Sequence, residues 1–461
     1  MDCVWLILDS LSFDIAPTSS AEIRETMPQL SQLATDHGVI FSDAYASGPY
    51  SPSSHASFFT GKRPSTAGMH EAHPFFDGDT PTITEALTET HETALVSTNP
   101  FLFNGLERGF HQTTDLTVRP YLLFEEATDP HEFLMYNRNY EKWEQRYRFL
   151  VDGGKPLRSL LNALSYKRWK QSGTNELIPE TTATDNEKYQ YADQISTYIR
   201  ERIDRDTDQF VVANYMDVHP PLNASEEALS KFAPNYSRNE LPIGVGISQK
   251  TEDEFGSDAT MALYRAAVWD LDRKVAPLIE HLVDNNVLVW VFSDHGAWFR
   301  NAPDLSEDRL KVPLMCFAPD QEPRTVDYTV NLKSIPHSTL TTLGISPESF
   351  QGPDLLSVSE DQQSISEHIQ REGDISGPVN LDAEIDGSQV QYDIALVEGE
   401  AMVKRVAGEW TSIRGDDDEA SSLRKKGERL INSQSLSVSP RDTDHDEETL
   451  QRLEQLGYLE E

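Results

Sequence analysis

The sequence predicts an α/β fold built around a mostly parallel β-sheet. Residues 3–8, 209–217 and 287–294 form apolar runs without the alternation of a half-exposed strand, which indicates strands buried on both faces. Between these runs lie segments whose apolar residues recur with helical spacing. Strands that alternate with helices predict a parallel sheet covered by helices on both faces.

The other elements continue this alternation along the chain. Two further buried strands are predicted at TALVST (93–98) and VPLMCFAP (312–319). Helices are predicted at 27–38, which ends at Gly38, at 82–89 and at 261–282.

The segment SGPYSPSSHASFFTG at residues 47–61 combines hydroxyl side chains with an apolar helical pattern. Ser51 is predicted as the N-cap and Pro52 as the first helical residue. A helix N-terminus also attracts anions through its free N–H groups and its dipole. A hydroxyl fixed there could therefore be a nucleophile towards a phosphate or sulfate ester, and the segment alone is compatible with both interpretations.

The pattern of the chain changes after about residue 375. Residues 390–414 resemble short antiparallel strands with a turn at Gly399-Glu400, and an amphipathic helical segment ends the sequence. We therefore predict an α/β domain at 1–375, with a helical insertion at 117–205, and a small C-terminal β-plus-helix subdomain at 376–461. Segments rich in Ser, Asp and Gly are predicted linkers at 354–380 and 415–445, and the acidic run 415–421 is predicted to be a solvated loop.

The charge of the chain is strongly negative. The 461 residues include 77 acidic and 39 basic side chains, a formal net charge of −38, and the acids are dispersed. Such a surface argues against non-specific binding to nucleic acid or to an anionic membrane. A dispersed acidic excess suits concentrated salt, where charge repulsion is screened, so we expect a halophilic protein from a cell that keeps salt in its cytoplasm.

The cysteines and the N-terminal segment favour an intracellular protein. Cys3 and Cys316 both lie in apolar strand-like runs and are predicted to be buried free thiols. MDCVWLILD has no basic start and meets Asp9 early, so no secretory signal peptide is predicted. The longest apolar runs, of about eight residues, are shorter than the roughly 20 that a spanning helix needs. We expect a cytoplasmic location.

Polar residues follow four of the predicted strands. In an open α/β sheet the ligand site lies beyond the carboxyl ends of the strands, so these residues should converge there. Hard carboxylate oxygens with one imidazole, at Asp9, Asp294 and His295, suit Mg²⁺, Mn²⁺ or Ca²⁺ better than structural zinc. The residues at the strand ends are Asp9, Asn99, Asp217, His219, Asp294 and His295.

These motifs resemble the sulfatase family within the alkaline phosphatase superfamily, in the form found in haloarchaea. The resemblance covers most of the chain and implies an alkaline-phosphatase-like fold. It rests on VWLILDSLSFD at 4–14, SPSSHASFFTGKRP from residue 51, NYMDVHPP at 214–221, SDHG at 293–296, LSEDRLKVPL at 305–314 and the terminal RLEQLGYLE.

The resemblance assigns a metal site to this chain. It implies one divalent cation, calcium, magnesium or manganese, bound by Asp9, Asp294 and His295. Ser10 stands where many sulfatases have a second aspartate or an amide, and it completes the candidate ligand set.

The resemblance also implies the catalytic and substrate-binding residues. Ser51 occupies the nucleophile position, and His219 would lie near the leaving-group oxygen. His55 stands where sulfatases carry an arginine that orients the nucleophile. The candidate substrate-binding residues are Asn99, Arg300 and Lys311, the last two being candidates for the basic residue of the loop after SDHG.

Three functions remain open at this point. The family implies hydrolysis of sulfate esters, with a saccharide or small organic substrate and no nucleic-acid or membrane partner. Sulfatases convert the nucleophile to formylglycine in a pattern that has Pro two residues on and Arg four residues on, where this chain has Ser53 and His55. We therefore expect Ser51 to remain serine, which would suit a phosphodiesterase or phosphotransferase. The third possibility is a catalytically degraded binding protein. The sequence does not define the oligomeric state.

Overall fold

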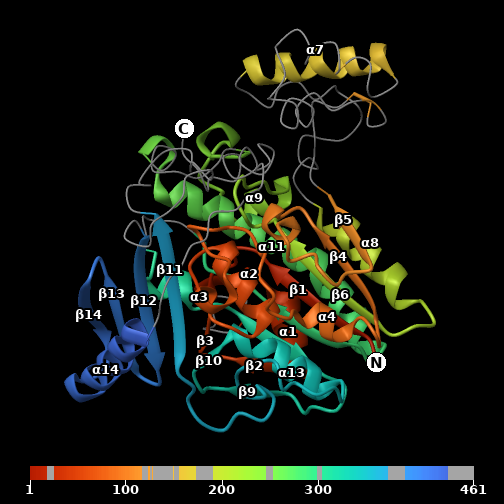
Figure 1. Ribbon diagram of the computed structural model, residues 1–461. Coiled ribbons are helices and arrows are strands. Elements are labelled where there is room, and N and C mark those ends of the chain that lie inside the picture. Colours follow the sequence, from red (N-terminus) through yellow and green to blue (C-terminus); the bar gives the residue numbers. More distant parts are fainter. Residues whose placement is uncertain are drawn as a thin grey trace. The chain divides into compact units, whose positions relative to one another are not determined.

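The structure is a computed structural model (Figure 1) that describes residues 1–17, 25–116, 155–172, 191–244, 253–297, 304–371 and 390–433, with Leu123, Phe124, Ala127 and Phe149. The chain divides into two compact units. Met1–Leu116, Tyr189–Asp374 and Ile385–Val438 form the first unit, and Thr117–Lys188, Ile375–Glu384 and Ser439–Glu461 form the second.

The first unit contains a central sheet of eight strands. Every neighbouring pair is parallel except the two pairs made by β8, which runs antiparallel to both of its neighbours. The order across the sheet is β5 (Gln112–Asp115), β4 (Glu92–Ser97), β6 (Gln209–Tyr215), β1 (Cys3–Leu8), β7 (Leu288–Phe292), β8 (Leu314–Phe317), β2 (Val39–Phe41) and β9 (Arg324–Val326).

Strand β1 lies inside the sheet, between β6 and β7, and is drawn in red in Figure 1. All six of its residues are buried, as the continuous apolar run predicts. Its side chains alternate between the two faces. Trp5 contacts the rings of Phe58 and Phe59 on one face, while Val4, Leu6 and Leu8 belong to the core on the other.

Helices cover both faces of the sheet. On the Val4 face, α11 packs against three other helices, α1, α8 and α9. On the Trp5 face, α2 packs against α3, α4 and α13, and the indole Nε1 of Trp5 donates to Thr339 Oγ1 of α13 at 3.2 Å. These helices, together with α12, have the following bounds: α1 (Pro28–His37), α2 (Ser51–Thr60), α3 (Pro64–Ala67), α4 (Ile83–Leu87), α8 (Ala192–Ile203), α9 (Glu226–Phe232), α11 (Ser257–Asp284), α12 (Glu307–Leu310) and α13 (Ile335–Thr342).

A second, antiparallel sheet follows in the sequence and carries one helix. Its order is β11 (Ser364–Arg371), β12 (Val390–Glu398), β13 (Ala401–Val406) and β14 (Glu409–Arg414), and α14 (Asp417–Ser433) packs against it. A short parallel pair, β3 (Ala44–Tyr45) with β10 (Val330–Asn331), lies in the same unit.

Two predictions for this region are wrong. The segments 354–380 and 415–445 contain β11 and α14, so neither predicted linker is simply a linker. The acidic run 415–421 begins α14 and is not a loop, because Asp416 Oδ1 accepts the backbone N–H groups of Asp418 and Glu419 at 3.0 and 2.9 Å. Acidic side chains at a helix N-terminus satisfy its free donors and its dipole, so this charge run favours helix initiation.

The second unit contributes one described helix, α7 (Pro156–Ser172). Asn162 of α7 is buried, and its Oδ1 accepts the backbone N–H groups of Leu123 and Phe124, each at 3.0 Å. The predicted C-terminal helix lies outside the described residues. The predicted division at residues 375 and 376 and the single insertion at 117–205 stay predictions.

The predicted fold class is confirmed: a mostly parallel central sheet with helices on both faces and a small antiparallel C-terminal sheet. Cys3 and Cys316 are buried free thiols, as expected. Within the described part of the chain, no helix has both the length and the apolar character needed to cross a membrane.

Candidate active site

Asp9 and Ser10 turn the chain at the carboxyl end of β1. Ser10 adopts the left-handed conformation (φ 60°), which is uncommon for a residue with a side chain. Tyr264 of α11 fixes this turn, since its hydroxyl donates to the Ser10 carbonyl at 2.8 Å and accepts the N–H of Ser12 at 2.9 Å. The turn directs Asp9 into the site, where Ser10 Oγ donates to Asp9 Oδ1 at 3.2 Å.

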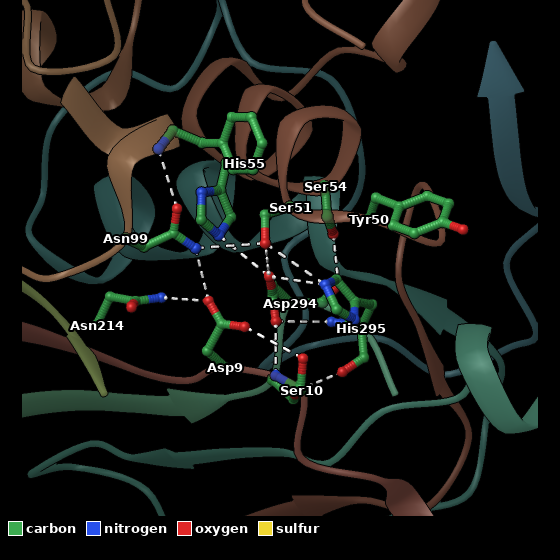
Figure 2. A network of polar contacts seen from close by, with 12 residues as sticks. Asp9, Ser10, Tyr50, Ser51, Ser54, His55, Asn99, Asn214, Asp294 and His295 are labelled. Atoms are coloured by element: carbon green, nitrogen blue, oxygen red, sulfur yellow. Dashed lines mark hydrogen bonds and ion pairs between the residues drawn. The ribbon is translucent and has the colours of Figure 1, made fainter. Parts of the chain in front are cut away.

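Two asparagine side chains from neighbouring strands hold the Asp9 carboxylate. Asn99, after β4, and Asn214, in β6, both donate from Nδ2 to Asp9 Oδ2, at 2.7 and 3.0 Å. Asn99 Oδ1 accepts the N–H of Phe101 at 3.0 Å, which fixes the orientation of its amide. Figure 2 shows both amides pointing at Asp9.

Ser51 begins α2 as its first residue, so Tyr50 occupies the N-cap position, one residue before the predicted cap. The Ser51 hydroxyl donates to Asp294 Oδ2 at 2.8 Å, and its Oγ lies 3.4 Å from His295 Nε2. Asn99 Nδ2 lies 3.3 Å from the same oxygen. The hydroxyl is therefore part of the Asp9–Asp294 network (Figure 2), and the capping interpretation of Ser51 is wrong.

Asp294 and His295 follow β7 and lie opposite Ser51. Asp294 Oδ1 accepts the N–H of Ser10 at 3.1 Å and that of His295 at 2.9 Å. His55, one turn after Ser51 on α2, places Nε2 3.2 Å from Asp294 Oδ2. The position of residue 55 therefore brings an imidazole to the carboxylate that accepts the Ser51 hydroxyl.

The surroundings of Asp294 favour its charged form. Burial opposes ionisation, but the charge interaction with His295 and the contact from His55 lower the pKa of Asp294 well below its ordinary value. Burial also lowers the pKa of His295, although Asp294 acts in the opposite direction. An ionised carboxylate beside a neutral imidazole is the protonation state that a metal ion requires.

Asp9, Asp294 and His295 form a group that fits a divalent metal ion. All three are buried, and each offers one ligand atom within 4.8 Å of the other two. In the part of the chain that the structure describes, this is the one group of three such residues. Two carboxylates and one imidazole are donors that suit magnesium, manganese or calcium.

The remaining predicted residues lie as follows. His219 follows β6 at the same sheet edge, and its Nδ1 lies 2.6 Å from the Pro220 carbonyl. Lys311 is paired with Asp43 at 2.8 Å, and its ammonium stands 4.6 Å from the centroid of the Phe13 ring. Arg300 lies outside the described residues.

Sequence reasoning missed three residues around this site. Asn214 interrupts the apolar part of β6 with an amide side chain, and this break in the apolar pattern could have indicated it from the sequence. Tyr50 directs its ring away from Ser51, and its hydroxyl donates to Asp304 Oδ1 at 2.7 Å. Arg309 places its guanidinium 4.5 Å from the centroid of the Tyr50 ring, although nothing in the sequence distinguishes it from other surface-type arginines.

Comparisons with known proteins agree with this architecture. Residues 2–345 match the family model described as Sulfatase. The phosphonate monoester hydrolase of Agrobacterium radiobacter shares 15% identity over 94% of this chain and 95% of that chain, with a TM-score of 0.63. The PsFucS1 sulfatase from Pseudoalteromonas sp. shares 13% identity over 95% and 92%, with a TM-score of 0.55. No curated protein matches the sequence.

A third solved structure, i-CgsB in complex with a neocarrahexaose, shares 17% identity over 98% of this chain and 97% of that chain, with a TM-score of 0.59. At such identities these likenesses establish the fold. Together with the family match, they define a sulfatase-like hydrolase of the alkaline phosphatase superfamily. The chain belongs to the sulfatase family, because the family model spans most of its length.

Proposed function

We propose that this protein is a metal-dependent hydrolase of sulfate esters, acting on a saccharide or another small organic alcohol. The observation that carries the proposal is the position of Ser51. Its Oγ lies at the start of α2, 2.8 Å from Asp294 Oδ2 and 3.4 Å from His295 Nε2, within a buried polar network. A hydroxyl at a helix N-terminus beside a metal-type ligand group is suited to attack an anionic ester.

Asp9, Asp294 and His295 would hold one divalent cation, calcium, magnesium or manganese, with Ser10 beside them. When bound, the ion would supply Lewis-acid stabilisation of negative charge at Ser51 and at the ester oxygens. Asn99 and Asn214 would keep one oxygen of Asp9 occupied by hydrogen bonds, so that the other remains available.

Ser51 would lose its hydroxyl proton to solvent water, and its Oγ would attack the sulfur atom of the ester. The new O–S bond forms while the bond from sulfur to the alcohol oxygen breaks, and His219 would donate a proton to that leaving oxygen. A carbonyl can only accept, so the contact with Pro220 fixes a proton on Nδ1 of His219 and leaves Nε2 to carry the transferred proton. Water would then attack sulfur and break the bond to Ser51 Oγ, with one of its protons passing to Nε2 of His219 and the other to Ser51 Oγ, so that sulfate is released and both residues are restored.

A second candidate is hydrolysis of phosphodiesters or related phosphoesters by unmodified Ser51. Ser53 and His55 favour it, because they replace the proline and arginine of the pattern that directs formylglycine formation in sulfatases. His55 contacts Asp294, so this departure lies inside the site. A serine nucleophile suits phosphoryl transfer, which depends mainly on positioning and charge stabilisation.

We also propose that the protein is halophilic, of haloarchaeal type and cytoplasmic. The net charge of −38 supports this proposal. Salt should relieve the repulsion among the dispersed acids, so Tm should rise up to molar KCl. A Tm that is highest in dilute buffer would contradict the halophilic proposal and leave the fold unaffected.

Mass spectrometry and kinetics test the proposed function together. The peptide containing residues 47–62, from protein made in its native host, would retain the mass of serine or be lighter by two hydrogens if formylglycine forms. Turnover of an aryl sulfate and of an aryl phosphodiester should then be compared with each divalent ion. Sulfatase activity supports the first proposal, and faster phosphodiester turnover with intact serine supports the second.

Two serines of α2 provide the variant and its control. Ser51→Ala should abolish turnover, because it removes the nucleophile. Ser57→Ala removes a buried hydroxyl that bonds to Ser47 Oγ and to the Lys62 carbonyl, so it should affect only stability. Equal activity of Ser51→Ala and wild type would refute both proposals, and metal binding with no turnover of any ester would indicate a binding protein.

A further inference from the structure

Arg309 is a buried cation placed beside the Ser51 site. It belongs to α12, is 1% exposed, and its Nη2 donates to the Pro49 carbonyl at 2.6 Å. The guanidinium stands over the Tyr50 ring, 4.5 Å from its centroid. It therefore contacts the two residues that directly precede Ser51.

Arg309 also touches the opposite side of the site. Its backbone carbonyl accepts the N–H of Gly296 at 2.8 Å, directly after Asp294 and His295. The packing is close, since a Cβ on Gly296 would lie 2.0 Å from the Asp308 carbonyl oxygen and 3.1 Å from Arg309 Cα. Arg309 thus joins the segment that carries Ser51 to the segment that carries the ligands.

The guanidinium has too few partners for a purely structural residue. Its Nε and Nη1 are buried and make no hydrogen bond within the described structure. Burying a charge without a full set of partners costs stability. Arg202, buried to a similar degree at 2% exposure, also has an Nε without a partner, but both of its terminal nitrogens donate, to Gln209, Gln112 and Tyr198, whereas Nη1 of Arg309 does not.

The positive charge of Arg309 reaches the site. The guanidinium lies against Pro49 and Tyr50, the two residues that precede Ser51. Lys311, one of the two predicted candidates for the basic residue, has its charge paired with Asp43, and the other, Arg300, lies outside the described residues. An anion bound at Ser51 would therefore meet the charge of Arg309 in a low-dielectric environment, where it acts strongly.

We propose that Arg309 supplies the fixed positive charge of the Ser51 site: it holds the Pro49–Ser51 turn against the Asp294 segment and stabilises negative charge on Ser51 Oγ and on the ester oxygens. It positions Ser51 through its contacts with Pro49 and Tyr50, and its charge acts on Ser51 Oγ and the ester oxygens across that turn. This inference rests on the proposed function, because an anionic ester must reach Ser51.

The test compares Arg309→Met with Arg202→Met, the matched buried arginine. Methionine fills similar volume without charge, so Arg309→Met should melt at or above the wild-type Tm. It should lower kcat by about 10²-fold, the effect of losing one fixed donor at a developing charge, with a smaller change in KM. Arg202→Met should lower Tm and leave kcat unchanged. Arg309→Lys, which keeps the charge, should recover part of kcat.

A binding measurement makes the result independent of turnover. Inorganic sulfate and inorganic phosphate should each raise the wild-type Tm above that in chloride of equal ionic strength, and Arg309→Met should lose this rise. Loss of the rise supports the proposal even if no tested ester is hydrolysed. A lower Tm in Arg309→Met with unchanged kcat and unchanged anion response would show that Arg309 has a purely structural role, and would overturn the proposal. A wild type that responds to neither anion would overturn it too.

Discussion

Polar side chains are buried at both ends of the central sheet, but they differ in how far the chain supplies their hydrogen-bond partners. At the end where the parallel strands begin, Arg202 donates to Gln209 and Gln112, whose strands lie on either side of β4. At the end where they finish, His55 Nδ1 and Asp217 Oδ2 are buried without a hydrogen-bond partner in the described structure. At the first end both terminal nitrogens of Arg202 have partners, and only its Nε has none.

This difference separates scaffold from site. A buried polar atom without a partner costs free energy, so proteins keep few of them. Two of the residues with such atoms, His55 and Arg309, contact Asp294 and the segment before Ser51, where an anionic substrate would bind, and the others are distributed over the described structure. The polar groups around Ser51 are therefore expected to serve function, and those around Arg202 stability. Substitutions around Ser51 should change activity, and substitutions around Arg202 should change stability.

Asp294→Ala should have the largest effect. It removes a proposed metal ligand and the acceptor of the Ser51 hydroxyl, so turnover should fall by about 10³-fold or more. Chelation should lower the wild-type Tm, because the proposed ion would couple the ends of β1 and β7, and it should no longer do so in the variant.

Asp272→Ala is the matched control for Asp294→Ala. Asp272 is a buried carboxylate of α11 that accepts the backbone N–H groups of Gln29 and Leu30 at the start of α1, at 3.0 and 2.8 Å. Its loss should lower Tm and spare both turnover and the chelator response. A wild-type Tm that chelator leaves unchanged, in fully metal-loaded protein, would show that the proposed ligand group is wrong.

Asn214→Ala should have an intermediate effect. Asn214 touches Asp9 and is not itself a proposed ligand, so its loss should weaken binding of the divalent ion by about 10- to 100-fold and leave the ion site intact. Calorimetric titration with manganese measures this change. Asn331→Ala serves as control, because Asn331 is equally buried but bonds to Ser47 and Ser364. Equal metal affinity in both variants would remove Asn214 from the site.

Asp217→Asn should have the smallest effect, seen only in the pH dependence of stability. Burial raises the pKa of Asp217 from 3.8 to about 6, although Lys274 and the Ala192 N–H oppose it. A raised carboxyl pKa contributes stability below the unfolded value, and that contribution is lost as pH rises through about 6. Asparagine does not titrate, so the stability of the variant relative to that of the wild type should increase between pH 4 and 6.

The expected increase in the free energy of unfolding of Asp217→Asn relative to wild type is at most roughly 3 kcal/mol, because the pKa of Asp217 rises from 3.8 to about 6. Its Oδ1 still accepts the Ala192 N–H, and the amide nitrogen replaces the carboxylate oxygen that has no partner. Thermal unfolding at several pH values measures the difference. A variant that loses stability relative to wild type as pH rises would contradict this prediction.

The sequence predicted the parts that follow from strand ends. Asp9, Asp294 and His295 were found because each follows a continuous apolar run, and parallel strands finish at one edge. Arg309 could not be found, because it comes from a four-residue helix whose packing against Pro49 depends on tertiary contacts. Helix α2 begins at Ser51, one residue earlier than predicted, because the Ser51 hydroxyl bonds to Asp294 rather than to its own helix.

The position of β1 between β6 and β7 has a consequence for how the protein folds during synthesis. β1 ends at Leu8, while its partners begin at Gln209 and Leu288. At about 5–20 residues per second, the ribosome needs roughly 10–40 s to reach the first partner, and longer to reach the second. During that interval an entirely apolar strand has neither neighbour. Productive synthesis should therefore depend on chaperones that shield Cys3–Leu8, and slowing translation before residue 209 should increase aggregation of the nascent chain.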